Sequence, residues 1–224
     1  MSLAHVCAAA VAGVRVDGAA VTVVVRAGQD TLHASDRVAG EIEEWQQSSG
    51  EGPAVDAFAA GGPVLAVDLD SRDSLARWPA FAPMALDSGA SAVFALPIQV
   101  GAIRLGVLDL YRSRPGMLAP DELSDALAFT EAAGVLLIDG VVGAQPGVAE
   151  LTWQHEDPTA HQIQVHQATG MIIAQLGTTA EIAYARLRAY AYAHDLRLGD
   201  VAREVVERRL RLDPDPLSHD PDPV

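Results

Sequence analysis

The sequence predicts an α+β fold, in which an antiparallel sheet flanked by helices is followed by a separate all-α module. Three observations predict it. The first 142 residues mix β-branched runs with helical periodicity and include two long strands joined by a two-residue turn. A break at "GAQPG" (143–147) ends this part, and only helical patterns follow it. A chain of 224 residues is long enough for two small domains, each with its own core.

The elements of the first part follow from local signals. The apolar, alanine-rich start lacks the basic residues of a signal peptide, so it predicts an opening helix. Proline and acids at 120–122 are typical of a first helical turn. In order, we expect a helix over 1–16, a hairpin over 18–35, two helices over 36–62 divided by "SGEGP", a short strand over 63–69, irregular helical turns over 74–89, two strands over 91–112 turning at Gly101–Ala102, and a helix over 120–142.

The second part predicts three helices. Asp157 and Pro158 are typical of the start of the first, and Gly177 of its end. Thr178-x-x-Glu181 is a capping-box pattern for the second helix. The third carries apolar residues at helical spacing and arginine–glutamate pairs four residues apart, which favour an exposed face. These pairs are Arg203 with Glu207, Glu204 with Arg208, and Glu207 with Arg211.

We therefore expect a first domain over 1–145, a linker over 146–157, a helical domain over 158–212 and an acidic tail over 213–224. The tail has too little apolar content to pack, so disorder is expected there. No apolar run reaches the length of a membrane span. The single cysteine, Cys7, cannot form an internal disulfide, which favours a cytoplasmic location.

Charge limits where a polyanion could bind. The formal net charge is −15, and all fifteen cations are arginines. The segment 182–212 is the exception, because it holds seven arginines against four acids. If nucleic acid is a partner, it meets this end. Arg188 and five further arginines are candidates for phosphate contacts, and three tyrosines lie among them as stacking faces, with a solvated helix face as the alternative. They are Arg186, Arg203, Arg208, Arg209 and Arg211, with Tyr184, Tyr190 and Tyr192.

Catalysis and metal binding find little support. The sequence contains no glycine-rich phosphate loop, no HExxH and no GxSxG motif. His155, His161 and His166 are spaced by six and five residues, whereas a chelating helical pair needs three or four. We therefore expect no enzyme, no metal and no cofactor. In the first part, aromatic side chains are candidates to line an apolar ligand pocket, with ordinary core packing as the alternative. They are Trp45, Phe58, Trp78, Phe81 and Phe94.

Two resemblances to known families add to this interpretation. Residues 2–142 resemble a GAF domain through "SGEGPAVDAFAAGGPVLAVDL", "RWPAFAPMALDSGASAVFALPIQVGAIRLGVLDLYR" and "PDELSDAL". Residues 160–212 resemble an ANTAR domain, a three-helix RNA-binding module of bacterial antitermination regulators. The residues that match its pattern are Gln167, Ala168, Gly170, Met171, Leu187, Arg188, Ala191, Leu198, Asp200, Val201, Ala202 and Val205.

The resemblances imply a cytoplasmic, dimeric regulator. The GAF-like part would sense a small-molecule ligand or a partner, and the ANTAR-like part would bind RNA stem-loops to promote transcription antitermination. Thr169 stands where the family usually has a basic residue, and His194 where it often has asparagine. Thr169 favours an alternative, in which the helical bundle only dimerises or docks a partner protein. The expected RNA-binding residues are Gln167, Ala168, Thr169, Gly170, Arg186, Arg188, Arg203 and Arg208.

Gly170 raises a question of its own, because a glycine inside a helix costs about 1 kcal/mol relative to alanine. Two explanations are open. With Ala168 and Thr169 it could form a flat patch that a base or a backbone approaches closely. Alternatively, another helix could pack against it.

Overall fold

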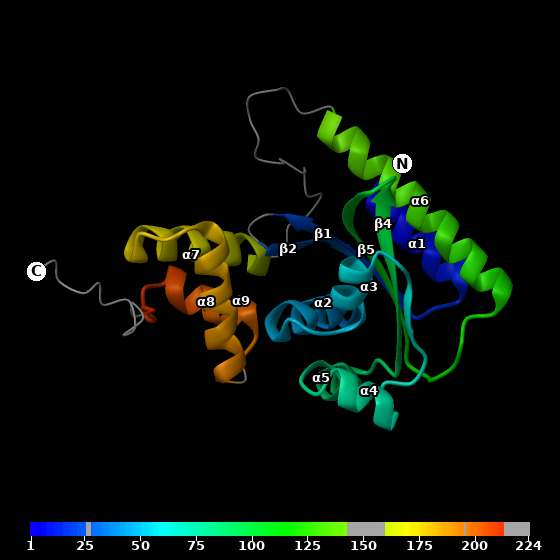
Figure 1. Ribbon diagram of the computed structural model, residues 1–224, viewed down its shortest axis with the longest axis horizontal. Coiled ribbons are helices and arrows are strands. Elements are labelled where there is room, and N and C mark those ends of the chain that lie inside the picture. The colour runs from blue at the N-terminus through cyan, green and yellow to red at the C-terminus, as the bar shows by residue number, and fades with distance from the viewer. Residues whose placement is uncertain (26–27, 143–159, 195, 213–224) are drawn as a thin grey trace, which may run out of the picture. The chain divides into compact units, whose positions relative to one another are not determined.

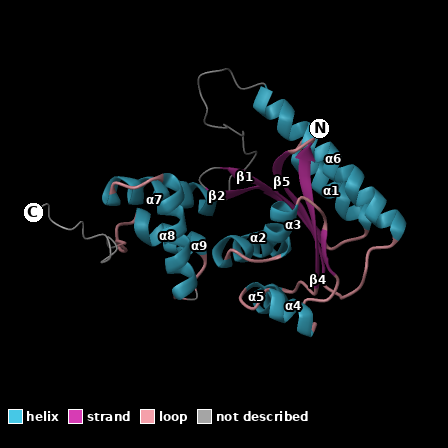
Figure 2. Ribbon diagram, viewed as in Figure 1, coloured by secondary structure: helices cyan, strands magenta, loops and turns pink. Residues whose placement is uncertain are grey.

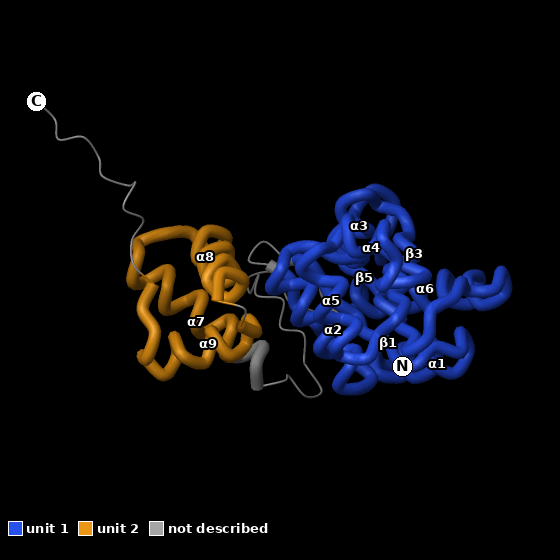
Figure 3. Tube along the Cα trace, turned by 90° about the horizontal axis from the view of Figure 1, so that it is seen from below, with its two compact units in different colours: residues 1–158 blue, residues 159–224 orange. Residues whose placement is uncertain are grey.

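The computed structural model describes residues 1–25, 28–142, 160–194 and 196–212. It divides into two compact units, 1–158 and 159–224 (Figure 3). The expected linker over 146–157 and tail over 213–224 lie outside the described residues, as does the start expected for the helix at Asp157 and Pro158. No helix among the described residues is long and apolar enough to cross a membrane.

The first unit is built on a five-stranded antiparallel sheet with strand order β2-β1-β5-β4-β3 (Figures 1 and 2). The elements, in chain order, are α1 (Leu3–Val14), β1 (Gly18–Val25), β2 (Gly28–Ala34), α2 (Arg37–Ser49), α3 (Pro53–Ala60), β3 (Val64–Ala66), α4 (Arg72–Arg77), α5 (Phe81–Ser88), β4 (Ala92–Val100), β5 (Ile103–Arg112) and α6 (Pro120–Val142). The predicted antiparallel sheet with flanking helices is confirmed.

Local sequence signals set several of these boundaries. Asp36 caps α2 by accepting a hydrogen bond from the Ala39 amide at 3.0 Å, and Gly50 ends the helix in the left-handed region. The β4–β5 hairpin turns at Gly101–Ala102 as predicted, with Val100 paired to Ile103. Gly101 has a φ of 59°, which glycine adopts without strain.

The sheet separates two layers of helices, as Figure 1 shows. On one face, α1 and α6 pack on the inward residues of β4 and β5, including Phe94, Leu96 and Leu108. On the other face, α2, α4 and α5 cover a second cluster around Ile42, Trp78 and Phe81. Each strand therefore sends alternate side chains into a different apolar layer, as the period of two requires.

The second unit contains three helices, α7 (Ala160–Leu176), α8 (Ala180–Ala193) and α9 (Leu198–Val206). Gly177, with a φ of 63°, ends α7 as predicted. The cap of α8 was predicted one residue too early. Thr179, not Thr178, is the N-cap, and its hydroxyl accepts from the Ile182 amide.

Candidate nucleic-acid interface

The bundle core is made by one apolar stripe from each of its three helices. Ala168 and Ile172 on α7, Leu187 on α8 and Val201 and Ala202 on α9 are fully buried. These positions recur at helical spacing, so the opposite side of each helix is left to solvent. The exposed sides of α7 and α8 are the surfaces available to a partner.

The exposed side of α7 carries the glycine that the sequence singled out. Gln167, Gly170 and Ala174 are exposed and follow one another at three- and four-residue spacing. A Cβ atom added to Gly170 would meet nothing within 4 Å. The explanation that another helix packs there is therefore wrong for the described part of this chain, and the surface at Gly170 is open.

Two neighbours of Gly170 do not belong to this surface. Ala168 is fully buried and Thr169 is 6% exposed, and both face the bundle core. The Thr169 hydroxyl donates to the Val165 carbonyl at 2.7 Å, one turn back on α7. The expectation that Ala168 and Thr169 form a flat RNA-binding patch with Gly170 is wrong, because both side chains are buried whereas Gly170 is exposed.

Thr169 stands where the family usually has a basic residue, and its burial shows what this difference does to the surface. A basic side chain at 169 would start from the core side of α7 and would have to extend along the helix to bring its charge to solvent. In this chain a hydroxyl satisfied by the helix backbone occupies that place. The substitution therefore leaves the exposed strip of Gln167, Gly170 and Ala174 intact.

The arginines divide into those held by carboxylates and those without such a partner. Arg203 pairs with Asp200 at 2.6 Å. Arg209 pairs with Glu204, also at 2.6 Å, and with Glu207. In the second unit, the arginines that make no ion pair with the described residues are Arg188, Arg208 and Arg211. Arg186 is half-buried and is not free of partners.

The predicted four-residue pairs of the third helix are wrong, because α9 ends earlier than expected. Its last residue is Val206, and Arg208 follows in the left-handed region with a φ of 61°. The Arg208 amide donates to Val205 and the Arg209 amide to Glu204, as in a Schellman motif. The chain therefore leaves the helix before Arg208. For this reason Glu204 and Arg208, and likewise Glu207 and Arg211, do not lie one turn apart on a single helix.

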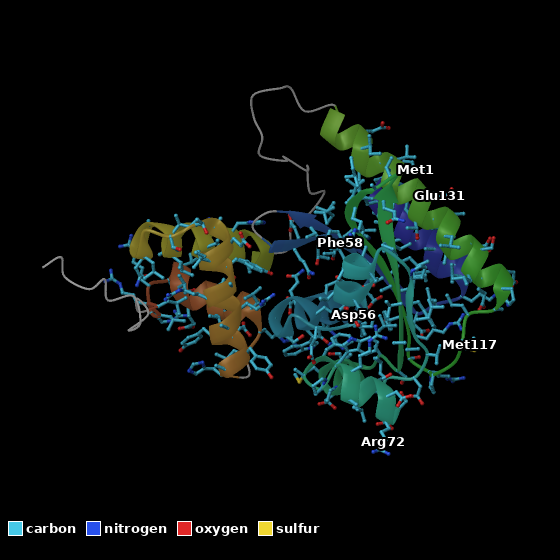
Figure 4. All side chains as sticks on the ribbon, viewed as in Figure 1. Met1, Asp56, Phe58, Arg72, Met117 and Glu131 are labelled. Atoms are coloured by element: carbon cyan, nitrogen blue, oxygen red, sulfur yellow. The ribbon has the colours of Figure 1, made fainter. Side chains whose placement is uncertain are left out.

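The aromatic side chains proposed for a ligand pocket do not converge on one site. Trp45, Trp78 and Phe81 belong to the cluster under α2 and α5, and Phe58 on α3 packs in a separate small cluster (Figure 4). Phe94 faces α1 and α6 on the other side of the sheet. A single pocket lined by all five residues is therefore excluded. The indole of Trp78 donates to Asp56 at 3.0 Å, and that of Trp45 to Ser88 at 3.2 Å.

A buried polar network that was not predicted from the sequence lies beneath α2. Glu43 and Asp109 are 2% and 4% exposed, on α2 and β5. Thr22 donates to Glu43 Oε2 and Gln46 donates to Asp109 Oδ2, both at 2.7 Å. The Gln46 carbonyl oxygen accepts the Ala54 amide of α3 at 2.7 Å. The network thus joins two strands and two helices on the α2 side of the sheet.

One proton completes this network. Glu43 Oε1 and Asp109 Oδ1 are buried and have no other donor among the described residues. Burial, with the neighbouring Asp109, raises the pKa of Glu43 well above its usual range. Burial also raises the pKa of Asp109, to about 6. A protonated Glu43 that donates to Asp109 satisfies both oxygens. One signal was present in the sequence, since Asp109 is an acid inside the apolar strand "LGVLDLYR".

Cys7 shows no sign of reactivity. It is fully buried in α1, and its burial raises the pKa of its thiol to about 12. A thiolate is the reactive form of cysteine, so this side chain is protonated at neutral pH. Among the described residues, no group of three or more histidines, cysteines and acids could hold a metal ion.

Comparison with known proteins identifies the helical unit. Residues 157–206 match the family model of the ANTAR domain. No curated protein matches the chain.

Solved structures resemble the first unit at low identity. The GAF domain of a two-component sensor histidine kinase from Bacillus halodurans is 13% identical, with a TM-score of 0.48, and the match covers 65% of this chain and 99% of that one. A domain assigned to a two-component sensor histidine kinase from Sinorhizobium meliloti 1021 is 17% identical, with a TM-score of 0.47, covering 62% and 90%. A free methionine-R-sulfoxide reductase from Thermoplasma acidophilum is 10% identical, with a TM-score of 0.42, covering 62% and 96%.

Residues 157–206 thus match the ANTAR domain, and they follow an N-terminal unit that has a five-stranded antiparallel sheet with flanking helices.

Proposed function

We propose that the chain is a signal-responsive, cytoplasmic regulator whose ANTAR domain binds RNA stem-loops and promotes transcription antitermination. The match of residues 157–206 to the ANTAR domain carries this proposal. In the proposal, the first unit senses a ligand or a partner and has no catalytic role. The buried, protonated Cys7 fits both a reducing compartment and the absence of thiol chemistry.

The RNA-binding surface that we propose combines an open strip with an available cation. Gln167 and Gly170 on α7 are exposed, and nothing in the bundle occupies the space above Gly170. Arg188 on α8 is half-buried and makes no ion pair with the described residues. A guanidinium without a carboxylate partner can bind a phosphate with two parallel hydrogen bonds. Arg203 is a weaker candidate, because Asp200 already binds it.

Replacing Arg188 by alanine tests the proposal. The affinity for a two-loop leader RNA should fall about tenfold on every RNA tested, since a charge-assisted contact contributes about 1.5 kcal/mol or more. Wild-type log K should fall with log salt at a slope of about −2 to −4, and the variant should flatten this slope by about 0.7. Fluorescence anisotropy at several salt concentrations measures both quantities.

Arg72→Ala provides the matched control, because it removes the same charge from α4 in the first unit, at an exposed position (Figure 4). It should leave affinity and slope unchanged. If wild type binds no leader RNA more tightly than tens of micromolar at low salt, the proposal fails. The bundle would then act as a dimerisation or docking module.

We also propose that the chain is a homodimer that packs through α6. Leu127 and Val135 are 42% and 59% exposed, and their eight-residue spacing places them on one side of this helix. Light scattering at micromolar concentration should give twice the chain mass of 23.5 kDa. Val135→Glu should shift the protein to monomer, whereas Ala76→Glu, at an exposed position of α4, should not. A monomeric wild type would contradict the prediction.

A further inference from the structure

The outer face of α8, defined here as Ile182, Ala185, Ala189 and Tyr192, has no partner within the bundle. All four residues are exposed, whereas Ala183, Leu187 and Ala191 on the opposite side are buried in the core. Ile182 and Tyr192 are 48% and 61% exposed. Small side chains at Ala185 and Ala189 keep the middle of this face flat. A large aromatic ring at one end of a flat, exposed surface is suited to contact with another planar group.

Among the tyrosines of α8, only Tyr192 offers an open ring. Tyr184 is 9% exposed and belongs to the core. Tyr190 stacks on His194, with ring centroids 4.0 Å apart and planes inclined by 18°. Within the described part of the chain, Tyr192 makes no hydrogen bond and no ring contact. Its ring is thus available to a ligand, whereas the other two are already engaged.

Arg188 lies one helical turn before Tyr192. Side chains four residues apart on a helix have Cβ atoms separated by about 6 Å, so one nucleotide can reach both the guanidinium and the ring. Arg188 makes no ion pair with the described residues, which leaves its charge available. A cation beside an open aromatic ring matches a nucleotide, in which a phosphate is attached near a planar base.

The charge of the described bundle favours a polyanion over a second copy. Its described residues include seven arginines and four acids, namely Glu181, Asp200, Glu204 and Glu207. A symmetric contact between two copies of this face would bring the same arginines together across the axis. Like charges in one interface oppose association, whereas phosphates would neutralise them.

We propose that an unpaired RNA base stacks on Tyr192 while Arg188 binds the adjacent phosphate. This inference rests on the proposed function and specifies which kind of RNA group the bundle takes. Sequence-specific recognition of RNA commonly uses loop bases that are splayed out and stacked on aromatic side chains. Loss of one such stacking contact typically lowers affinity between about fivefold and a hundredfold.

The test uses the full chain and a stem-loop RNA with 2-aminopurine at one loop position at a time. With wild type, the fluorescence of one position should change on binding, because that base transfers its stacking to Tyr192. Tyr192→Leu should lose this signal and bind about tenfold more weakly. Tyr192→Trp should restore both. Leu196→Ala, which trims an exposed apolar side chain outside this face, should match wild type.

The outcomes separate the two proposals. If wild type and Tyr192→Leu bind equally and give the same fluorescence changes, the stacking site is wrong although RNA binding stands. If wild type binds no RNA, the proposed function fails, and the stacking site with it. Circular dichroism verifies that the variants fold, and Tyr192 is exposed, so its replacement should leave the helices unchanged.

Discussion

Replacing Glu43 by glutamine is expected to remove most of the loss of stability that the N-terminal unit shows as the pH rises above 6. Folded wild type retains the Glu43 proton, because burial raises the pKa of this carboxyl well above its usual range. The unfolded chain releases that proton at ordinary acidic pH. Stability then falls by about 1.4 kcal/mol for each pH unit over which the folded state holds one extra proton. The difference in stability between variant and wild type should therefore grow as the pH rises above 6.

The direction follows from the sign of the pKa changes. A carboxyl whose pKa is raised by folding contributes fully below its unfolded pKa, and that contribution is lost as the pH rises through the folded value. Asp109 behaves in the same way, with a folded pKa of about 6 against its usual 3.8. The Asp17 and Glu122 carboxyls have lowered pKa values, mainly because each accepts a backbone amide, so they act in the opposite sense at acidic pH. The loss of stability that begins near pH 6 therefore comes from the buried pair, because the raised pKa values of the Cys7 thiol and the Tyr111 phenol act only at higher pH.

The side-chain amide that Glu43→Gln introduces can donate to Asp109 without titrating, so the network keeps its donor. The side chains that donate hydrogen bonds to the pair are Thr22 and Gln46, which do not titrate in this range. Urea unfolding, followed by the fluorescence of Trp45 and Trp78, measures stability from pH 5 to pH 9. Glu131→Gln, at an exposed position on α6 (Figure 4), should follow wild type. A variant with the wild-type pH profile would show that Glu43 holds no proton at neutral pH.

The elements of the first unit could be predicted because their signals are local. The β4–β5 hairpin follows from two alternating runs around Gly101–Ala102, and the start of α2 from Asp36. The pairing of Glu43 with Asp109 could not be predicted in this way. It joins residues far apart in the sequence, and it depends on how α2 lies over β1 and β5. The acid within an apolar strand was visible, but its partner was not.

In the second unit, too, features set by local sequence could be predicted, whereas features set by packing between helices could not. The exposure of Gly170 and the burial of Ala168 depend on which side of α7 meets α9, and an alanine-rich helix with several small residues gives little indication of that side. The end of α9 was misjudged for a different reason. Arg208 adopts the left-handed conformation that usually requires glycine or asparagine, so the sequence shows no stop signal there. The arginine–glutamate pairs expected at four-residue spacing therefore include residues that lie beyond the end of α9.

Replacing Gly170 by leucine is expected to abolish RNA binding while the bundle remains folded. Alanine and leucine both have higher helix propensity than glycine, by about 1 kcal/mol for alanine and somewhat less for leucine. A Cβ at this position meets nothing within 4 Å, so no clash offsets that gain. The glycine therefore costs stability without serving the packing of the described bundle. A close approach of RNA to the α7 backbone accounts for it, and the added leucine side chain would hold the RNA away.

Thermal unfolding and RNA anisotropy on the same samples separate the two effects of replacing Gly170. Gly170→Ala should keep or raise the melting temperature and weaken RNA binding several-fold, and Gly170→Leu should weaken it by at least about fiftyfold, equivalent to about 2.3 kcal/mol. Ala9→Leu adds comparable bulk at an exposed position of α1 in the first unit and should bind like wild type. A lower melting temperature for Gly170→Ala would instead mean that a second chain packs on this strip, because the described bundle leaves it open. Unchanged affinity in Gly170→Leu would place the RNA on another face, and the outer face of α8, with Arg188 and Tyr192, would then have to bind it without α7.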